Sequence, residues 1–585
     1  MIRNHLKVAI QNLLRFKFVA IINLIGLTAG FVVCGMIYLF VQNELSYDRF
    51  HINADRLYRL TTEFRYPGTA PRILAQSAAP MAPHIQRRFS NVEAFTRLVT
   101  FENNTIFKYD NREVIIKKSF AADTSFFQLF DFELIAGDAN TALRAPSSVV
   151  LTEKLAAQLF PNEEPLGKII TQTSALGADR DTTVAYIITG IMNNIPQHSH
   201  LQFDALFNID SSLPGDRNGQ EWHGVFTNTY FLMRNPVHDI ISFENQIAQS
   251  LEPVMKGSNY IRLHVQPLSD VHLGSVEVTE DHINYQKFDR RYIYIFSIIA
   301  LIVLTIAGVN FTNLSTVIAH KRAKEIGIRK TIGASRTSII AQFLGESVLL
   351  TFIAAGISVL LIDFLFPYLQ VFIGREIKVN VFQNLPFLIS LLGVALLLGL
   401  LAGLYPAVYM SSFRPVQALK KLQLGNSPKR LIINSLVVTQ FIAATVLIIG
   451  TIVVVQQLNF LRNEDKGFNT SQVITIDLGY GNWGKYDALK NDWLGLAGVE
   501  DVTASRSMLG SEAVQTGISF KDPEGAQQNI AIPVLLTDDN YLAFYDMQLA
   551  AGRNFSENAA QNGKEYIINE TLAKQIGWED PVGQP

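Results

Sequence analysis

The sequence contains a single cysteine, Cys34, among its 585 residues. An internal disulfide and a cysteine-based metal site are therefore both excluded. Charge is also scarce: charged residues make up 17% of the chain, and the net charge is only -2. Such a chain has no general basic field, so we expect no nucleic acid among its partners.

Long apolar runs are what the sequence does contain. Hydrophobic residues make up 48% of it, with a mean hydropathy of +0.18, which indicates a mixture of soluble and membrane material. Five runs reach the ~20 residues that a helix needs to cross a hydrocarbon core ~30 Å thick. We therefore expect transmembrane helices at 18–41, 292–314, 345–366, 386–410 and 432–455.

The first run follows a basic segment, as the core of a signal peptide does. It is longer than such a core, and no small-residue cleavage site precedes VQNELSYDRF. Val33 before Cys34 also departs from a lipoprotein signal. We interpret this run as an uncleaved membrane anchor.

Basic residues predict the orientation, because loops rich in Lys and Arg stay in the cytoplasm. The segments before the first run and after the fourth contain no acid, whereas 367–385 has only Arg375 and Lys378 beside Glu376. The N-terminus is therefore predicted to be cytoplasmic. The predicted cytoplasmic segments are 1–17, 315–340 and 411–431, and the outside segments are 42–290 and 456–585.

The first outside segment is predicted to be a folded domain. Its alternating stretches REVIIKKSF, SSVVLT and VAYIITGIM are typical of strands, and EKLAAQLF is typical of a short helix. We expect an α/β or α+β domain at 42–290.

Two pairs of similar segments indicate an internal repeat. DTSFFQLFDFELIAGD, from Asp123, resembles DNYLAFYDMQLAAGRN, from Asp539. SVVLTEKLAAQLFPNEEPLGK, from Ser148, resembles YIINETLAKQIGWEDPVGQ, from Tyr566. We therefore expect two tandem repeats, with residues 456–585 beginning a second, truncated copy of the outside domain. On this hypothesis the chain is a fragment, and three more spans follow in the gene.

Several separated stretches carry a resemblance to a known family. KRAKEIGIRKTIGASRTSIIAQFLGES resembles the signature of the FtsX-like, MacB-type ABC transporter permeases. NHLKVAIQNLLRFKFVAIINLIGLTAGF, ELSYDRFHINADRLYRL, ITGIMNNIPQHSHLQFD and GLYPAVYMSSFRPVQALK are also similar to family sequences. The resemblance implies a multi-pass α-helical protein of the bacterial inner membrane with a MacB-like periplasmic core domain at 42–290. It further implies that a cytoplasmic ABC ATPase subunit closes on ATP and that this motion is transmitted to the periplasmic domains.

The 315–340 segment is the expected contact with that ATPase. A Lys or Arg at the bilayer centre costs ~2.5–3.5 kcal/mol, so this basic segment must lie outside the lipid. Ile326, Ile328 and Ile332 are expected to provide an apolar docking side, and Glu325 to pair with a basic residue of the partner. The predicted coupling residues are Lys321, Arg322, Glu325, Ile326, Gly327, Arg329, Lys330 and Gly333. The alternative is an ordinary positive-inside loop held to anionic lipid.

No nucleotide site is expected in the chain itself. The closest match to G-x-x-x-x-G-K-[ST] is GYGNWGKY, where Tyr486 replaces the small hydroxyl residue and the segment lies outside the cytoplasm. We therefore expect no directly bound cofactor, no enzyme activity, and ATP hydrolysis by a separate partner. Family members with a fused ATPase differ in this respect, so equivalence to a macrolide pump is not implied.

Other candidate sites are weaker. His198, His200 and Asp204, with His223 further along, are suitable metal ligands, but their spacing fits no closed zinc pattern, so we interpret them as a structural turn. A membrane-tethered hydrolase that uses His198 or His200 is one alternative function. No Gly-x-Ser-x-Gly motif supports it.

Five residues of the spans are candidates for helix packing. Gly26 and Gly30 form a G-x-x-x-G motif, which suits either an interface between halves or packing within the chain. Asn310 and Asn313 share one face of the second span. Glu346 begins the third span, and an ionisable residue there is a functional candidate.

The predicted function is therefore a permease subunit that works in the lipid bilayer by mechanotransmission, in export, efflux or lipoprotein release. A homodimer or pseudo-dimer, and a periplasmic adaptor or substrate protein, are further expected partners. The main alternative is a membrane-anchored receptor or scaffold without ATP coupling.

Overall fold

The computed structural model describes most of the chain as two units, Met1–Ser46 with Asp289–Asn463 (the membrane unit) and Tyr47–Phe288 with Glu464–Pro585 (the outer unit). The described residues are 15–65, 71–101, 105–116, 118–174, 182–211, 222, 224–255, 260–375, 377, 379–412, 428–476, 478, 484–510, 514–521, 524–556 and 565–584. The predicted cytoplasmic segments 1–17 and 411–431 therefore lie largely outside the described residues, as does His223.

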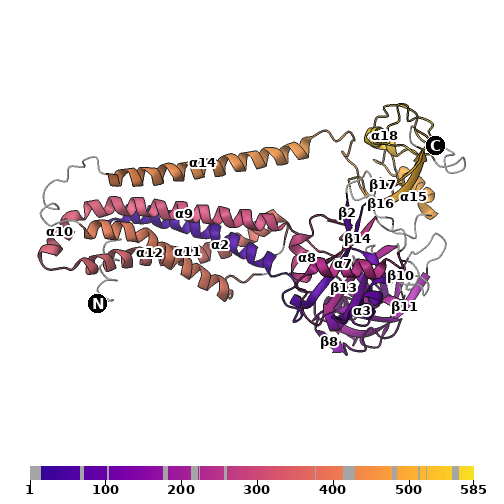
Figure 1. Cartoon of the computed structure of the whole chain (residues 1–585), viewed down its shortest axis with the longest axis horizontal. Helices are drawn as coiled ribbons and strands as arrows, with labels where there is room; N and C mark the ends of the chain where they lie inside the picture. Colours follow the sequence, from indigo (N-terminus) through magenta and orange to yellow (C-terminus); the bar gives the residue numbers. More distant parts are fainter. Residues whose placement is uncertain are drawn as a thin grey trace. The chain divides into compact units, whose positions relative to one another are not determined.

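The described part of the membrane unit contains five helices that are long and apolar enough to cross a bilayer (Figure 1). They are α2 (Lys17–Leu45), α9 (Arg290–Lys321), α11 (Arg336–Ile373), α12 (Leu385–Ser411) and α14 (Pro428–Asn463). Each contains one predicted apolar run. The helices are longer than the runs, because polar turns continue them beyond the hydrocarbon region.

Packing between α2 and α9 depends on the two glycines of the G-x-x-x-G motif. A Cβ on Gly30 would lie 2.9 Å from Ala307 Cβ, and one on Gly26 would lie 3.5 Å from Asn310 Nδ2. Small residues allow two helix backbones to approach this closely. The structure thus places both glycines against α9 of the same chain, with Asn313 half-buried one turn further along α9.

Residues 47–288 of the outer unit are built on a mixed sheet. Among the described residues the strand order is β15-β2-β1-β13-β4-β7-β12-β9-β11-β10-β5-β6, with β14 on β1, β3 on β13 and β8 on β11. The strands are β1 (Leu57–Phe64), β2 (Arg72–Leu74), β3 (Ser77–Ala78), β4 (Val92–Phe101), β5 (Thr105–Tyr109), β6 (Arg112–Ile116), β7 (Ser119–Ala122), β8 (Leu134–Gly137), β9 (Ser148–Thr152), β10 (Ile169–Ser174), β11 (Thr182–Met192), β12 (Ala205–Asn208), β13 (Val225–Met233), β14 (Ile261–Pro267) and β15 (Val278–Thr279). The helices are α3 (Met81–Arg88), α4 (Phe126–Leu129), α5 (Glu153–Leu159), α7 (Ile240–Leu251) and α8 (Leu268–Gly274). The predicted α/β or α+β class is therefore observed.

The sheet holds together because its central strands are buried on both faces. Strand β9 is buried along its whole length, and so are β7 and β12. One core cluster is rich in aromatic rings, with Phe126 and Phe203 at a ring-centroid distance of 6.0 Å. Such aromatic pairs add to the free energy gained by burying apolar area. Helix α5 begins where Thr152 accepts a hydrogen bond from the Leu155 amide.

The described residues of 464–585 contain smaller elements. They are α15 (Tyr486–Leu494), α16 (Tyr541–Phe544), α18 (Glu570–Ile576) and the antiparallel strands β16 (Val514–Lys521) and β17 (Gln527–Val534). In the aligned repeat segments, α16 occupies the position of α4, and α18 occupies that of α5. Asn569 caps α18 through the Leu572 amide, as Thr152 caps α5. No strand precedes α18 at the described positions that align with β9, so the tandem repeat stays a prediction.

Candidate coupling site

A short helix, α10 (Ala323–Thr331), connects α9 to α11. Its end is defined by Gly333, whose φ of 102° lies in the left-handed region that favours glycine. Ser335 then begins α11, because its hydroxyl accepts a hydrogen bond from the Ser338 amide. The break between α10 and α11 therefore falls at Gly333.

One face of α10 is packed against the membrane unit. Ile326 is only 3% exposed and belongs to a cluster with Ile339 and Phe343 of α11 and Met410 of α12. Gly327 is also buried. Burying an isoleucine side chain contributes about 1.5–3 kcal/mol, so this face fixes α10 to two transmembrane helices.

A buried ion pair fixes the start of α10. Arg322 donates to Glu346 of α11 through both terminal nitrogens, at 2.7 and 3.2 Å. Gln342 donates to the same carboxylate at 2.9 Å, and the guanidinium lies over the Phe343 ring at 4.7 Å. This two-point geometry is the strong form of a charged hydrogen bond. Glu346, which sequence reasoning treated only as a lone ionisable residue, is thus the partner of a predicted coupling residue.

The acid of the coupling segment is also paired within the chain. Glu325 accepts a hydrogen bond from Arg329 at 2.8 Å and lies 3.7 Å from Arg15. Arg329 in turn donates to Gln342 at 2.8 Å. Glu325 is therefore engaged by cations of this chain, whereas the sequence hypothesis assigned it a basic residue of the partner.

Two further cations meet the C-terminal end of α12. Lys330 donates to the Ser411 carbonyl at 2.6 Å, and Arg336 donates to the Ser411 hydroxyl at 3.2 Å. Positive charge is favourable at the carbonyl end of a helix. Burial, with a smaller contribution from Arg336, lowers the pKa of Lys330.

The opposite face of α10 is open. Lys324, Ile328 and Ile332 are exposed, with Ile332 at 82%. The side chain of Lys321 lies outside the described part of the structure. An exposed apolar pair beside a lysine, on a helix whose other face is locked to the bundle, is the arrangement expected of a docking surface.

Two family models match the chain. The model of the MacB-like periplasmic core domain matches residues 20–249, and the model of the FtsX-like permease C-terminal domain matches residues 297–415, which include α10 and the helices around it. The chain belongs to the FtsX-like, MacB-type family of ABC transporter permeases. It is therefore a membrane protein of the bacterial inner membrane.

Relatives of this permease are named as transporters. The uncharacterized ABC transporter permease YvrN of Bacillus subtilis is 23% identical over 447 residues, covering 71% of this chain and 99% of that protein. The "Probable export ATP-binding/permease protein" of Pseudomonas fluorescens is 24% identical and aligns with 51% of this chain and 42% of its own length. The macrolide export ATP-binding/permease protein MacB of Syntrophobacter fumaroxidans is 35% identical over 130 residues, which are 21% of this chain and 16% of that protein. This chain thus spans less than half the length of the latter two relatives.

Two solved structures are also similar in part. One is a domain of a permease protein from Porphyromonas gingivalis, 23% identical with a TM-score of 0.32, covering 37% of this chain and 92% of that one. The other is the periplasmic region of MacB from Actinobacillus actinomycetemcomitans, 13% identical with a TM-score of 0.26, covering 36% and 87%.

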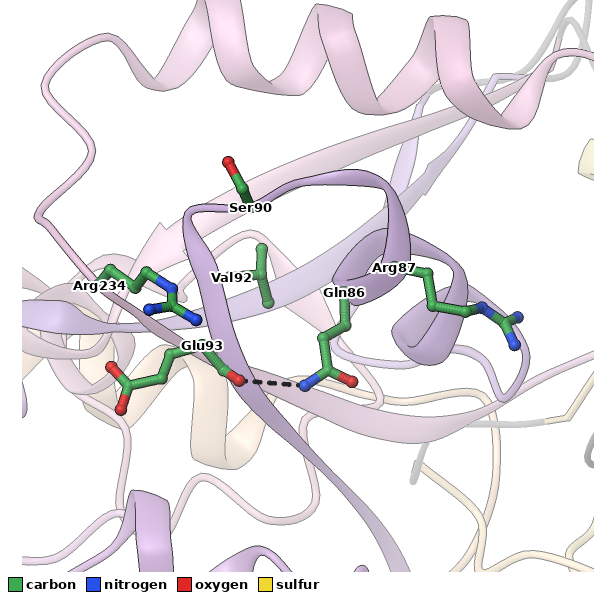
Figure 2. A pocket seen from close by; sticks show the side chains of 6 residues that line it. All are labelled: Gln86, Arg87, Ser90, Val92, Glu93 and Arg234. Atoms are coloured by element: carbon green, nitrogen blue, oxygen red, sulfur yellow. Dashed lines mark hydrogen bonds between the residues drawn. The ribbon is translucent and has the colours of Figure 1, made fainter.

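The outer unit of the permease carries an open groove of about 590 Å³ (Figure 2). Gln86 of α3 donates to the Glu93 carbonyl of β4 at 3.1 Å, and both residues line the groove. Arg87 and Arg234 project from its two sides, as Figure 2 shows. The lining, which includes the Ser90 hydroxyl, offers charge and hydrogen bonds that suit docking of a polar partner.

The histidines of QHSHLQFD lie in the interior of the outer unit. His200 is fully buried, with Nδ1 2.8 Å from Asp48 and Nε2 2.8 Å from the Tyr230 hydroxyl. Asp204 follows at the start of β12, where burial raises its pKa. In the described part of the chain, no group of three or more His, Cys, Asp or Glu side chains is placed to hold a metal ion. The motif therefore belongs to a buried polar network of the outer unit.

A neighbouring histidine, His51, is expected to make residues 47–288 of the outer unit (the outer domain) less stable in acid. Asp131 N–H donates to His51 Nδ1 at 3.0 Å, so this buried ring is neutral. Burial lowers its pKa to about 4, opposed by Asp48 and reinforced by His200 and His198. Because the unfolded ring has a pKa near ~6.5, the unfolded state binds more protons between these values. His51 thus stabilises the fold above that range, and we expect about 2 kcal/mol to be lost between pH 7 and pH 5.

The measurement is urea unfolding of the outer domain at several pH values, for the wild type and for His51→Asn. Asparagine keeps an acceptor for Asp131 N–H but does not titrate. The variant is expected to be less stable at pH 7 yet flatter with pH. Equal pH slopes for the two proteins would show that another group carries the effect.

Proposed function

We propose that this chain is the permease subunit of an ABC transporter whose motor is a separate cytoplasmic ATPase that docks on α10. One observation supports this most: α10 is locked to α11 and α12 on one face, while Lys324, Ile328 and Ile332 are exposed on the other. A force applied to such a helix moves the transmembrane helices directly. A loop held to lipid by charge alone would need neither the buried isoleucine nor the buried ion pair.

Names and topology support the same proposal. Relatives that carry both functions are named ATP-binding/permease proteins, whereas YvrN is named a permease. Basic residues flanking α2 and α9 favour a cytoplasmic N-terminus and a periplasmic outer unit. In this arrangement α10 is on the side where ATP is available. Movements of α2 and α9 then pass to the periplasmic domain, whose groove between Arg87 and Arg234 is a candidate surface for a substrate or adaptor protein.

The repeat belongs to this proposal as well. Residues after α14 would then form a second outer domain, related to the first as in a pseudo-dimer. The apolar stretch of α14 is exposed in the described chain, as is typical of a helix that faces lipid or another helix. The class of transported substrate is set by the periplasmic parts.

The test is affinity purification of the permease from detergent-solubilised membranes, with bound proteins identified by mass spectrometry. Ile328→Glu and Ile332→Glu place an acid on the open face of α10 without touching its packed face. We expect recovery of a P-loop ATPase to fall roughly tenfold or more, as when a charge is buried in the centre of an interface.

The matched control is Ile241→Glu, the same change at a residue of α7 that is 66% exposed. It should leave ATPase recovery unchanged. If no ATPase co-purifies with the wild type under gentle conditions, the receptor or scaffold function replaces this proposal. If an ATPase is recovered equally with all variants, the permease function stands but α10 is not its docking site.

A further inference from the structure

Two segments of the chain join residues 47–288 of the outer unit to transmembrane helices α2 and α9. Tyr47–His51, the leading segment, follows α2, and Asp281–Phe288, the trailing segment, precedes α9. Connecting segments usually run over the surface and are mobile. Here each segment has several side chains in the interior of the outer unit.

His200 contacts both segments. Its ring nitrogen Nδ1 lies 2.8 Å from Asp48 Oδ1, and its amide donates to the same oxygen at 3.0 Å. Its carbonyl accepts a hydrogen bond from the Tyr285 amide at 2.8 Å. His200 therefore holds the leading segment with its ring and amide, and the trailing segment with its carbonyl.

His272, in α8, contacts the same two segments. Its ring stacks on Tyr47, with the centroids 3.4 Å apart and the planes at 4°. Its carbonyl accepts a hydrogen bond from the Phe288 amide at 3.0 Å. Two buried histidines that are distant in sequence thus share one arrangement, in which the ring meets the leading segment and the carbonyl meets the trailing one.

A buried polar path connects the two segments a third time. Tyr230 and Arg59 face each other across β13 and β1, where hydroxyl and guanidinium interact electrostatically, and the Tyr230 hydroxyl lies 2.8 Å from His200 Nε2. Arg59 pairs with Asp281 at 2.6 Å, with both side chains fully buried. The path from Asp48 to Asp281 is therefore continuous. In a low-dielectric interior the hydrogen bonds and ion pairs of such a path are stronger than they would be in water.

We propose that His200 and His272, with this polar path, form a clamp that positions the two connecting segments, so that displacement of α2 and α9 turns the outer domain as one body. A loose connection would absorb such a displacement. This inference rests on the proposed function for its use in transport, but the clamp itself is a property of the outer unit and is measurable without an ATPase.

The experiment is hydrogen exchange on the full chain in detergent, comparing the wild type with the His200→Ala, His272→Ala double variant. The variant removes both rings but leaves both carbonyls. We expect the amides of Asp48 and His51 to exchange roughly tenfold faster, because their segment loses its ring contacts. Amides of the trailing segment that bind the two carbonyls should change much less. His264→Ala is the control, since that ring pairs with Glu63 and Glu244, in neither segment.

Two results would overturn the clamp: unchanged exchange in the leading segment, or an equal increase in every strand of the outer domain, which would indicate general destabilisation. Tyr47→Leu removes only the stacked ring and gives the same test if the double variant does not fold. With ATPase and ATP present, the double variant should still bind the ATPase but lose any ATP-dependent change in outer-domain exchange. If the wild type binds no ATPase, that result contradicts the proposed function but leaves the hydrogen-exchange test of the clamp valid.

Discussion

Asp281→Ala is expected to lower the unfolding free energy of the outer domain by about 3–5 kcal/mol, because it leaves a fully buried guanidinium without its acid. Arg59 donates to Asp281 at 2.6 Å, and to Gln266 and Ser275 at 2.9 Å each. The two neutral acceptors remain in the variant, but they do not compensate a buried charge. The measurement is the urea midpoint from pulse proteolysis of the full chain in detergent.

The comparison variant is Glu113→Ala, which breaks the pair with Lys108, where both side chains are about half exposed. An exposed pair is worth about 0–1 kcal/mol, so the midpoint should barely move. Asp281→Asn keeps an acceptor for Arg59, so its urea midpoint should lie between those of Asp281→Ala and Glu113→Ala. Equal losses for Asp281→Ala and Glu113→Ala would mean that the buried pair contributes no more than a surface pair.

Some of this molecule could be predicted from the sequence, because hydropathy needs no knowledge of tertiary contacts. Five apolar runs predicted five long helices, alternating stretches predicted β9 and β11, and EKLAAQLF predicted α5. The helix ends were less accurate: the third run was predicted from residue 345, whereas α11 begins at Arg336. Hydropathy detects the part of a helix that lies in lipid, and the amphipathic turns beyond it are polar.

The side-chain contacts of the candidate site and of the clamp were predictable only where the two residues are close in sequence. The contact between Glu325 and Arg329 is an i,i+4 pair, so it was available from sequence spacing alone. The Arg322–Glu346 pair joins two helices, and the polar path between Asp48 and Asp281 depends on sheet register between residues more than 150 positions apart. Local patterns carry no information on such pairs. QHSHLQFD was interpreted as a structural turn, and it does lie between β11 and β12, but the sequence did not indicate the partners of its histidines.

Glu346→Ala should have the second large effect, on the membrane unit and on coupling together. It leaves Arg322, which is only 4% exposed, facing an apolar helix interface without its acid. We expect the free energy of unfolding of the membrane unit to fall by about 3–5 kcal/mol. The lost bond is also what fixes the start of α10 to α11. ATPase recovery should therefore fall even though no residue of the open face is changed. Resistance to unfolding by SDS and ATPase co-purification are the two measurements.

Glu325→Ala is the matched control, because it removes an acid from the same segment whose pair with Arg329 is 31–39% exposed. This control should lower the free energy of unfolding by only about 0.3–0.5 kcal/mol. The double variant Arg322→Met, Glu346→Leu replaces the ion pair by apolar contacts and should recover much of the lost stability, since such exchanges are often neutral or stabilising. If it recovers stability and ATPase binding together, the pair acts by fixing α10 in place. Recovery of stability alone would mean that the charges themselves act in coupling.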